Sequence, residues 1–117
     1  MFVELPPFQR LRVDYFDDEH FRALQNALLA HPEAGDVIEG AGGLRKLRFA
    51  DPGRQKGARG GLRVIYFWWE DEQQFWLFTV YDKDTRDDLS ADQKQALRER
   101  IKLELQARSE RRGRKRN

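Results

Sequence analysis

The stretch "GLRVIYFWWEDEQQFWLFTVY", residues 61–81, contains two long apolar segments separated by a polar turn. Residues 61–69 have a single charged side chain, that of Arg63. A strand that is apolar at successive positions is buried on both faces of its sheet. Residues 75–81 have the same character, and residues 70–74 between them are polar. The pattern predicts an antiparallel hairpin of two central strands.

A third strand is predicted immediately before this hairpin, in "LRKLRFA", residues 44–50. Side chains alternate between the two faces of a strand. Lys46 and Arg48 should therefore point to one face and Arg45 to the other. We expect Arg45 to lie outside any site that Lys46 and Arg48 form.

The remaining segments predict a short first strand and three helices. Pro7 can open the first helix, Asp17 can cap the second, and Pro32 ends the second. Ser90 and Gln93 have the spacing of a capping box for the last helix. The apolar stripe of that helix is formed by Leu97, Ile101 and Leu105.

The predicted order is therefore β-α-α-β-β-β-α. Helices and strands that do not alternate one by one predict an α+β fold. We expect an antiparallel sheet with the helices packed on one face, in a single domain over residues 1–107. Residues 108–117 contain no apolar side chain and are expected to be a basic, disordered tail.

Charge is distributed in alternating blocks although the formal net charge is only +2. Residues 41–69 carry seven basic side chains and one acidic one, whereas residues 1–40 carry three basic and eight acidic ones. Residues 70–90 are again acidic and residues 91–117 are basic. Segregation of this kind predicts a cationic surface for a polyanion, which acts locally because salt screens distant charges.

Several classes of protein are disfavoured by composition. There is no cysteine, so disulfides, thiol catalysis and zinc–thiolate sites are excluded. His20 and His31 stand apart from the basic segment, and no His, Asp or Glu cluster has metal-ligand spacing, so we predict neither metal nor cofactor. No apolar run approaches membrane length, and the start lacks signal-peptide character. We expect a cytoplasmic protein that binds no membrane.

The candidate functional residues follow from the predicted sheet. Arg63, inside an apolar strand, is either a structural ion-pair partner of Asp82 or Asp84, or an anion-binding group on an exposed sheet face. The glycine-rich loop "ADPGRQKGARGG", residues 50–61 between two of the predicted strands, lacks P-loop spacing and suits contact with a nucleic-acid backbone. The predicted RNA-binding residues are Arg54, Lys56, Arg59 and Arg86.

The segments "GGLRKLR" (42–48) and "GGLRVIY" (60–66), with the "DL-x-x-x-Q" helix start at 88–93, resemble the RelE/HigB-like toxins of type II toxin–antitoxin systems. The resemblance covers most of residues 1–108. It implies a small α+β domain that cuts mRNA in the ribosomal decoding site. The catalytic residues that the resemblance implies are Lys46, Arg48, Arg63 and Lys83, and Tyr81 just beyond the last strand is added as a candidate.

The resemblance also implies partners: the ribosome with its mRNA, and a cognate helix-turn-helix antitoxin whose complex with the toxin binds operator DNA. The acidic block 1–40 and the last helix are expected antitoxin-docking surfaces. Some members of the family use a tyrosine in the last helix or a histidine near the carboxyl end, and this chain has neither. The general base is therefore left open among Lys46, Lys83 and, as a helper, Tyr81.

RNA supplies its own nucleophile, the 2′-OH beside the scissile phosphate. Permanently charged arginines such as Arg48 and Arg63 suit stabilisation of the phosphorane. Two alternatives remain open from the sequence: a ParE-like inhibitor of DNA gyrase, and a nucleic-acid-binding module without activity.

Overall fold

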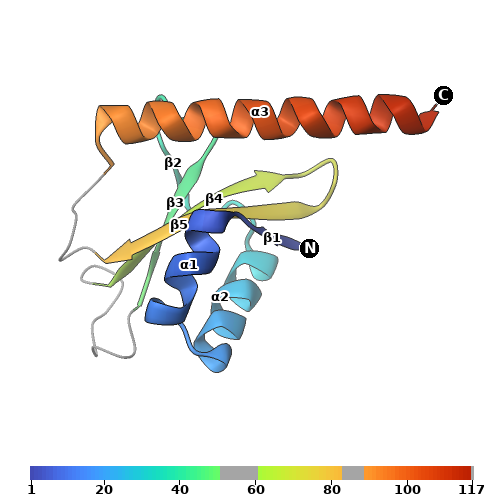
Figure 1. The fold of residues 1–117 in the computed structure, drawn as a ribbon. Helices are drawn as coiled ribbons and strands as arrows, with labels where there is room; N and C mark the ends of the chain where they lie inside the picture. Colours follow the sequence, from blue (N-terminus) through green and yellow to red (C-terminus); the bar gives the residue numbers. More distant parts are fainter. Residues whose placement is uncertain (51–60, 83–88, 117) are drawn as a thin grey trace.

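The computed structural model describes residues 1–50, 61–82 and 89–116, with side chains as far as Glu110. The protein has an α+β fold (Figure 1). Its elements are, in chain order, β1 (Phe2–Glu4), α1 (Pro6–Tyr15), α2 (Asp18–Ala30), β2 (Asp36–Val37), β3 (Arg45–Phe49), β4 (Leu62–Trp69), β5 (Gln74–Asp82) and α3 (Ala91–Arg116). The two-residue strand β2 is an addition to the predicted order.

The five strands form one sheet in the order β1-β5-β4-β3-β2. The pairs β3–β4 and β4–β5 are antiparallel, as predicted for the hairpin and the strand before it. The expectation of an antiparallel sheet is wrong at one edge, because β1 pairs with β5 in parallel. Strands joined by a tight turn are readily recognised as neighbours, whereas a parallel pair needs a long connection whose course the local sequence does not specify.

The first apolar cluster lies between the sheet and the pair α1 and α2. It joins residues of both helices to alternate residues of the central strands. Its fully buried members include Phe8, Leu24, Leu28, Leu62 and Val64. The cluster fixes the two helices on one face of the sheet (Figure 1).

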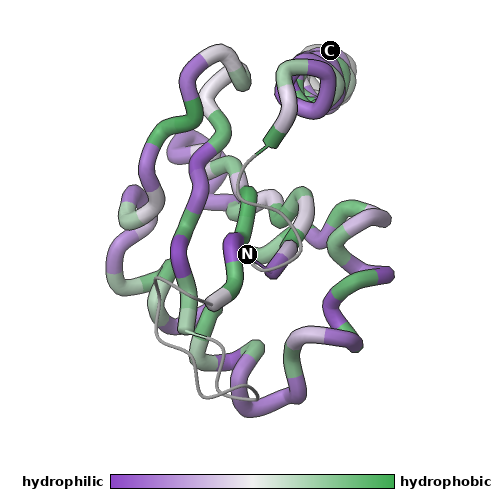
Figure 2. Tube along the Cα trace, turned by 90° about the vertical axis from the view of Figure 1, so that its left-hand side faces the viewer, coloured by the Kyte–Doolittle hydropathy of each residue, from purple (hydrophilic) through white to green (hydrophobic). Residues whose placement is uncertain are grey.

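The second apolar cluster lies on the opposite face, under α3. It contains Ile65 and Trp76 from the central strands and Ile101 from α3, with Leu97 and Leu105 packed against it. The prediction that the helices share one face is therefore wrong. Strands β4 and β5 are apolar on both faces, so each face has to be covered. Figure 2 shows α3 nearly end-on, apart from the other two helices.

Helices α2 and α3 begin at the predicted capping residues. The backbone N–H of His20 donates to Asp17 Oδ1 at 2.8 Å. This hydrogen bond, with the adjacent His20 side chain, lowers the pKa of the Asp17 carboxyl. At the start of α3, Ser90 N donates to Gln93 Oε1 at 2.8 Å and Gln93 N donates to Ser90 Oγ at 3.1 Å. The predicted capping box is confirmed.

Helix α3 comes close to the backbone at the turn before β3. A Cβ atom on Gly42 would lie 3.1 Å from Arg98 Cγ and 3.2 Å from Ile101 Cγ2. Gly42 also has φ +70, a conformation that favours glycine. Both facts allow α3 to rest directly on this turn.

The backbone of α3 continues to Arg116, so residues 108–116 extend the helix in this structure. Arg108 contacts the sheet, its guanidinium carbon lying 4.7 Å from the centre of the Trp76 ring. Among the described residues, no helix combines the length and the apolar character that crossing a membrane requires.

Candidate functional site

Three of the predicted catalytic residues form one row across the sheet. Arg48 on β3 pairs with Arg63 on β4, and Arg63 pairs with Tyr81 on β5. Side chains directly opposite each other in antiparallel strands share a face, with Cβ atoms about 4.5–5.5 Å apart. Tyr81 belongs to the cluster under α3. The row therefore lies on the α3 side of the sheet.

Lys46 lies on the same face as this row, two residues before Arg48 on β3. It pairs with Ile65, which belongs to the cluster under α3. Leu47, between the two basic residues, packs against the cluster on the opposite face. The predicted alternation along β3 is confirmed.

Arg45 is directed away from the row, as the alternation predicts. Its Nη1 donates to the carbonyl oxygens of Gly35 at 2.8 Å and Glu33 at 3.3 Å. Its Nη2 lies 3.8 Å from Glu33 Oε2. Arg45 therefore holds the segment between α2 and β2. It does not contribute to the basic face, the side of the sheet that carries Lys46, Arg48 and Arg63.

Arg63 is buried, with 4% of its surface exposed. This burial excludes the predicted exposed anion site, and the predicted alternative of an ion pair with Asp84 lies outside the described residues. In the structure its Nη1 donates to the carbonyl oxygens of Leu62 at 3.2 Å and Gly61 at 3.5 Å. A buried guanidinium needs such acceptors because its desolvation is costly. The guanidinium of Arg63 is thus held against the backbone at the start of β4.

Tyr81 is also a core residue, 7% exposed, in the same cluster as Leu89 at the approach to α3. Arg48, in contrast, is exposed to solvent, and Lys46 is half-buried. The row thus runs from an accessible cation on β3 to buried groups on β4 and β5. A phosphate arriving from solvent would meet Arg48 and Lys46 first.

The ends of three strands meet beside this row. Phe49 pairs with Leu62, and Leu62 pairs with Asp82. Both the segment between β3 and β4 and the segment after β5 leave the sheet from this end. The other predicted residues lie on these segments, outside the described residues: Arg54, Lys56, Arg59, Lys83 and Arg86.

One residue that positions the basic face was not singled out from the sequence. The hydroxyl of Tyr66 donates to the carbonyl oxygen of Pro32 at 2.8 Å and accepts from the backbone N–H of Gly35 at 3.0 Å. Burial raises the pKa of Tyr66. A tyrosine in an otherwise apolar buried strand was the available signal, because a buried hydroxyl needs a partner.

Gly35 makes the close approach to Tyr66 possible. A Cβ atom there would lie 2.8 Å from Tyr66 Cε1 and 3.0 Å from the carbonyl carbon of Lys46. The next residue, Asp36, pairs with Lys46 in the β2–β3 ladder. The Tyr66 hydrogen bonds therefore fix β2 against β3 and, with it, the surroundings of Lys46.

The histidines lie away from the basic face, as expected. His20 Nδ1 is 2.7 Å from Asp17 Oδ1 at the start of α2, and His31 caps the end of the same helix. In the described part of the chain, no group of three or more His, Asp or Glu side chains could hold a metal ion. Compared with models of known protein families, the sequence matches none of them.

Proposed function

We propose that this protein is a RelE/HigB-like toxin: a ribosome-dependent endoribonuclease that cuts mRNA and is neutralised by a helix-turn-helix antitoxin in the cytoplasm. The observation that carries the proposal is the row of Arg48, Arg63 and Tyr81, joined by Lys46 on the same face of the sheet. Lys46, Arg48 and Arg63 are the residues that match the family's basic set, and Tyr81 is the candidate helper. The α+β order of the elements supports the same proposal.

In the proposed reaction the 2′-oxygen of a nucleotide bonds to the adjacent phosphorus, and the bond from phosphorus to the 5′-oxygen of the next nucleotide breaks. The 2′-hydroxyl proton passes to a base, and a proton is delivered to the leaving 5′-oxygen. The products are a 2′,3′-cyclic phosphate and a 5′-hydroxyl end. No external oxidant, metal or cofactor enters this balance.

The positions of the side chains suggest separate roles. Arg48 is exposed and can donate to the non-bridging oxygens as charge builds up on the phosphorane. Arg63, buried beside it, contributes a fixed positive charge in a region of low dielectric, where such a charge acts more strongly. We assign Arg63 as a positioning residue.

Lys46 is the candidate base on the described part of the sheet that solvent reaches, since Tyr81 is buried. Lys83 remains a candidate outside the described residues. A weak base is compatible with the reaction if the ribosome holds the mRNA in line, because positioning can supply several kcal/mol of the barrier.

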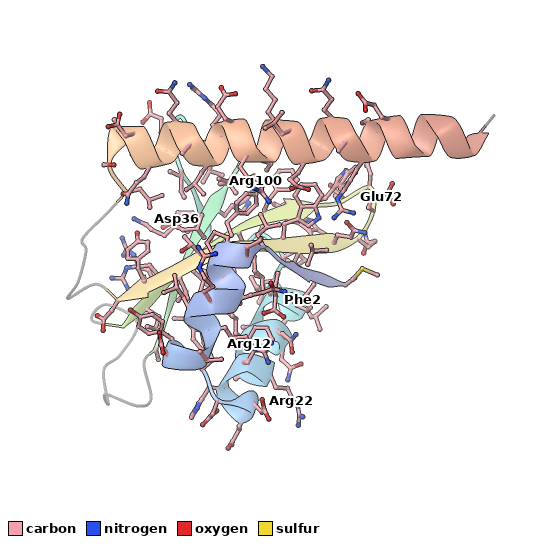
Figure 3. All side chains as sticks on the ribbon, in the orientation of Figure 1. Phe2, Arg12, Arg22, Asp36, Glu72 and Arg100 are labelled. Carbon is pink, nitrogen blue, oxygen red and sulfur yellow. The ribbon has the colours of Figure 1, made fainter. Side chains whose placement is uncertain are left out.

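The proposal is tested by comparing Arg48→Ala with Arg22→Ala in a translation reaction on a defined mRNA. Arg22 is exposed on α2 and points away from the sheet (Figure 3), so its loss changes the net charge equally. We expect Arg48→Ala to lower the cleavage rate roughly 100- to 1,000-fold, as loss of one transition-state donor does. Arg22→Ala should cut like the wild type.

Cleavage is read by primer extension, with and without ribosomes, and circular dichroism checks that both variants are folded. Cuts within codons that need ribosomes and need Arg48 support the proposal. Intact mRNA accompanied by DNA breaks would instead indicate gyrase poisoning. Binding of RNA without any cleavage would indicate a non-enzymatic module.

A further inference from the structure

A small cavity of about 170 Å³ lies beside the row, between β3 and the start of α3. Lys46 and Arg48 line it from the sheet, and Lys94 lines it from α3. Asp36 and Glu39 line the side next to β2. In Figure 3, Asp36 lies beneath the first turns of α3. Three cations from two separate elements therefore face one cavity.

The charges of this cavity favour an anion. Its three basic and two acidic side chains leave one net positive charge, which one phosphodiester would neutralise. Among the residues that the structure describes, neither Arg48 nor Lys94 has a carboxylate within ion-pair distance. The two carboxylates are exposed, where water and salt weaken their effect.

The backbone fixes Lys94 in place. It is the fourth residue of α3, and its N–H donates to the carbonyl oxygen of Ser90 at 2.9 Å. Ser90 and Gln93 cap this helix start. The same turn carries the positive end of the helix dipole, which adds to the attraction for an anion. Lys94 is half-buried, so its charge is screened less than that of a fully exposed lysine.

We infer that Lys94 binds a second phosphate of the RNA backbone, next to the scissile phosphate that Arg48 contacts. This inference rests on the proposed function. Arg48 belongs to both the row and the cavity, and Lys94 lines the same small cavity from α3. Arg48 can therefore contact the scissile phosphate while Lys94 contacts its neighbour.

Lys94 is on this account an RNA-binding residue without a part in the chemical step. Its contact is to a phosphate, so it carries no sequence information. It fixes the register of the strand on the sheet and thereby places one particular phosphate against Arg48. Neither the pattern of the strands nor the resemblance to the toxin family points to this lysine.

The test measures RNA binding in the absence of cleavage. The probe is a short single-stranded RNA with 2′-O-methyl groups, which lacks the attacking hydroxyl. Its affinity for the full-length protein is measured by fluorescence anisotropy over a series of salt concentrations. For single strands, the slope of log K against log salt changes by about 0.7 for each phosphate contact. We expect Lys94→Gln to reduce the slope by about 0.7, and Lys94→Arg to retain it.

Lys102→Gln is the matched control. Lys102 is exposed on the same helix, and its substitution removes the same charge. We expect it to leave the slope unchanged. Equal slopes for Lys94→Gln and Lys102→Gln, or a wild type without salt-dependent binding of this RNA, would overturn the inference. Circular dichroism of each variant excludes loss of the fold as the cause.

Cleavage of translated mRNA by the wild type, measured in parallel, separates this inference from the proposed function. A protein that leaves mRNA intact but shows the Lys94-specific loss of slope would refute the nuclease assignment and retain the phosphate site. A protein that cuts mRNA while Lys94→Gln binds RNA like the wild type would refute the phosphate site alone.

Discussion

Two polar side chains of the apolar strand β4, those of Tyr66 and Arg63, form hydrogen bonds with backbone groups. Tyr66 places its hydroxyl between the backbone of Pro32 and that of Gly35. Arg63 directs its guanidinium to carbonyl oxygens at the start of its own strand. A buried polar group costs free energy unless it has a partner, so these contacts are what permits a tyrosine and an arginine in β4.

Tyr66→Phe should lower the free energy of unfolding by about 1–3 kcal/mol, because it leaves a buried N–H and a partly buried carbonyl without their hydroxyl partner. Urea denaturation at neutral pH measures the effect. Tyr15→Phe is the control, since Tyr15 is only half-buried and no hydrogen bond is seen for its hydroxyl in the described part of the chain. Equal stability of Tyr66→Phe and the wild type would contradict the assigned role.

The difference in stability between the wild type and Tyr66→Phe should depend on pH in alkaline solution. The pKa of Tyr66 is raised in the folded state, so its neutral form is favoured there. The stability that this shift contributes is complete below the unfolded pKa of about 10 and is lost as the pH rises through the folded pKa. We therefore expect the stability difference between the wild type and Tyr66→Phe to narrow above pH 10. A difference that stays constant there would argue against the buried hydroxyl.

Helix α3 is fixed to the sheet by a narrow apolar stripe. Ile101 is 2% exposed, whereas Leu97 and Leu105 are only partly buried. The colouring of Figure 2 shows α3 as mainly hydrophilic around this stripe. Because α3 covers the apolar face next to the basic row and carries Lys94, its docking determines the shape of the proposed RNA site.

Ile101→Ala should loosen α3 selectively. Loss of a buried isoleucine costs about 2–5 kcal/mol, and here the cost falls on the docking of one helix. We expect the amide hydrogens of α3 to exchange faster while those of β4 and β5 stay protected. Leu103→Ala, at a position that is 61% exposed on the same helix, should leave exchange unchanged. Uniform acceleration throughout the protein would show instead that α3 and the sheet unfold together.

The basic row and the Lys94 cavity share the α3 side of the sheet, and α1 and α2 cover the other side. Beyond Arg108, α3 continues past the sheet (Figure 1). The fold of residues 1–108 therefore has little need of the last residues.

A chain ending at Arg108 should be as stable as the full-length protein, within about 0.5 kcal/mol, the range typical of surface changes. The contact of Arg108 with Trp76 is retained in the shortened chain. Thermal unfolding of the two proteins side by side measures the difference. A drop of several degrees in Tm would mean that residues 109–117 contribute to the fold.

The local patterns predicted the elements well because the information is contained in neighbouring residues. The β4–β5 hairpin, the facing of Lys46, Arg48 and Arg45 along β3, and the capping residues are all confirmed. The bulge that shifts the β4–β5 register between Ile65 and Tyr66 was not anticipated. It lies in the middle of two largely apolar runs, where no glycine marks it and Thr79 is the one polar residue nearby.

The amino-acid sequence alone was enough to establish an α+β chain, a two-sided hairpin and a set of cations on one face of a strand, because spacing and hydropathy specify these directly. Only the tertiary structure decided that β1 joins β5 in parallel, that α3 covers the opposite face from α1 and α2, and that Lys94 and Arg48 line one cavity. These features depend on long connections and on which face each helix covers. The need to bury both faces of β4 and β5 determines which helix covers which face, and no short stretch of sequence specifies that arrangement.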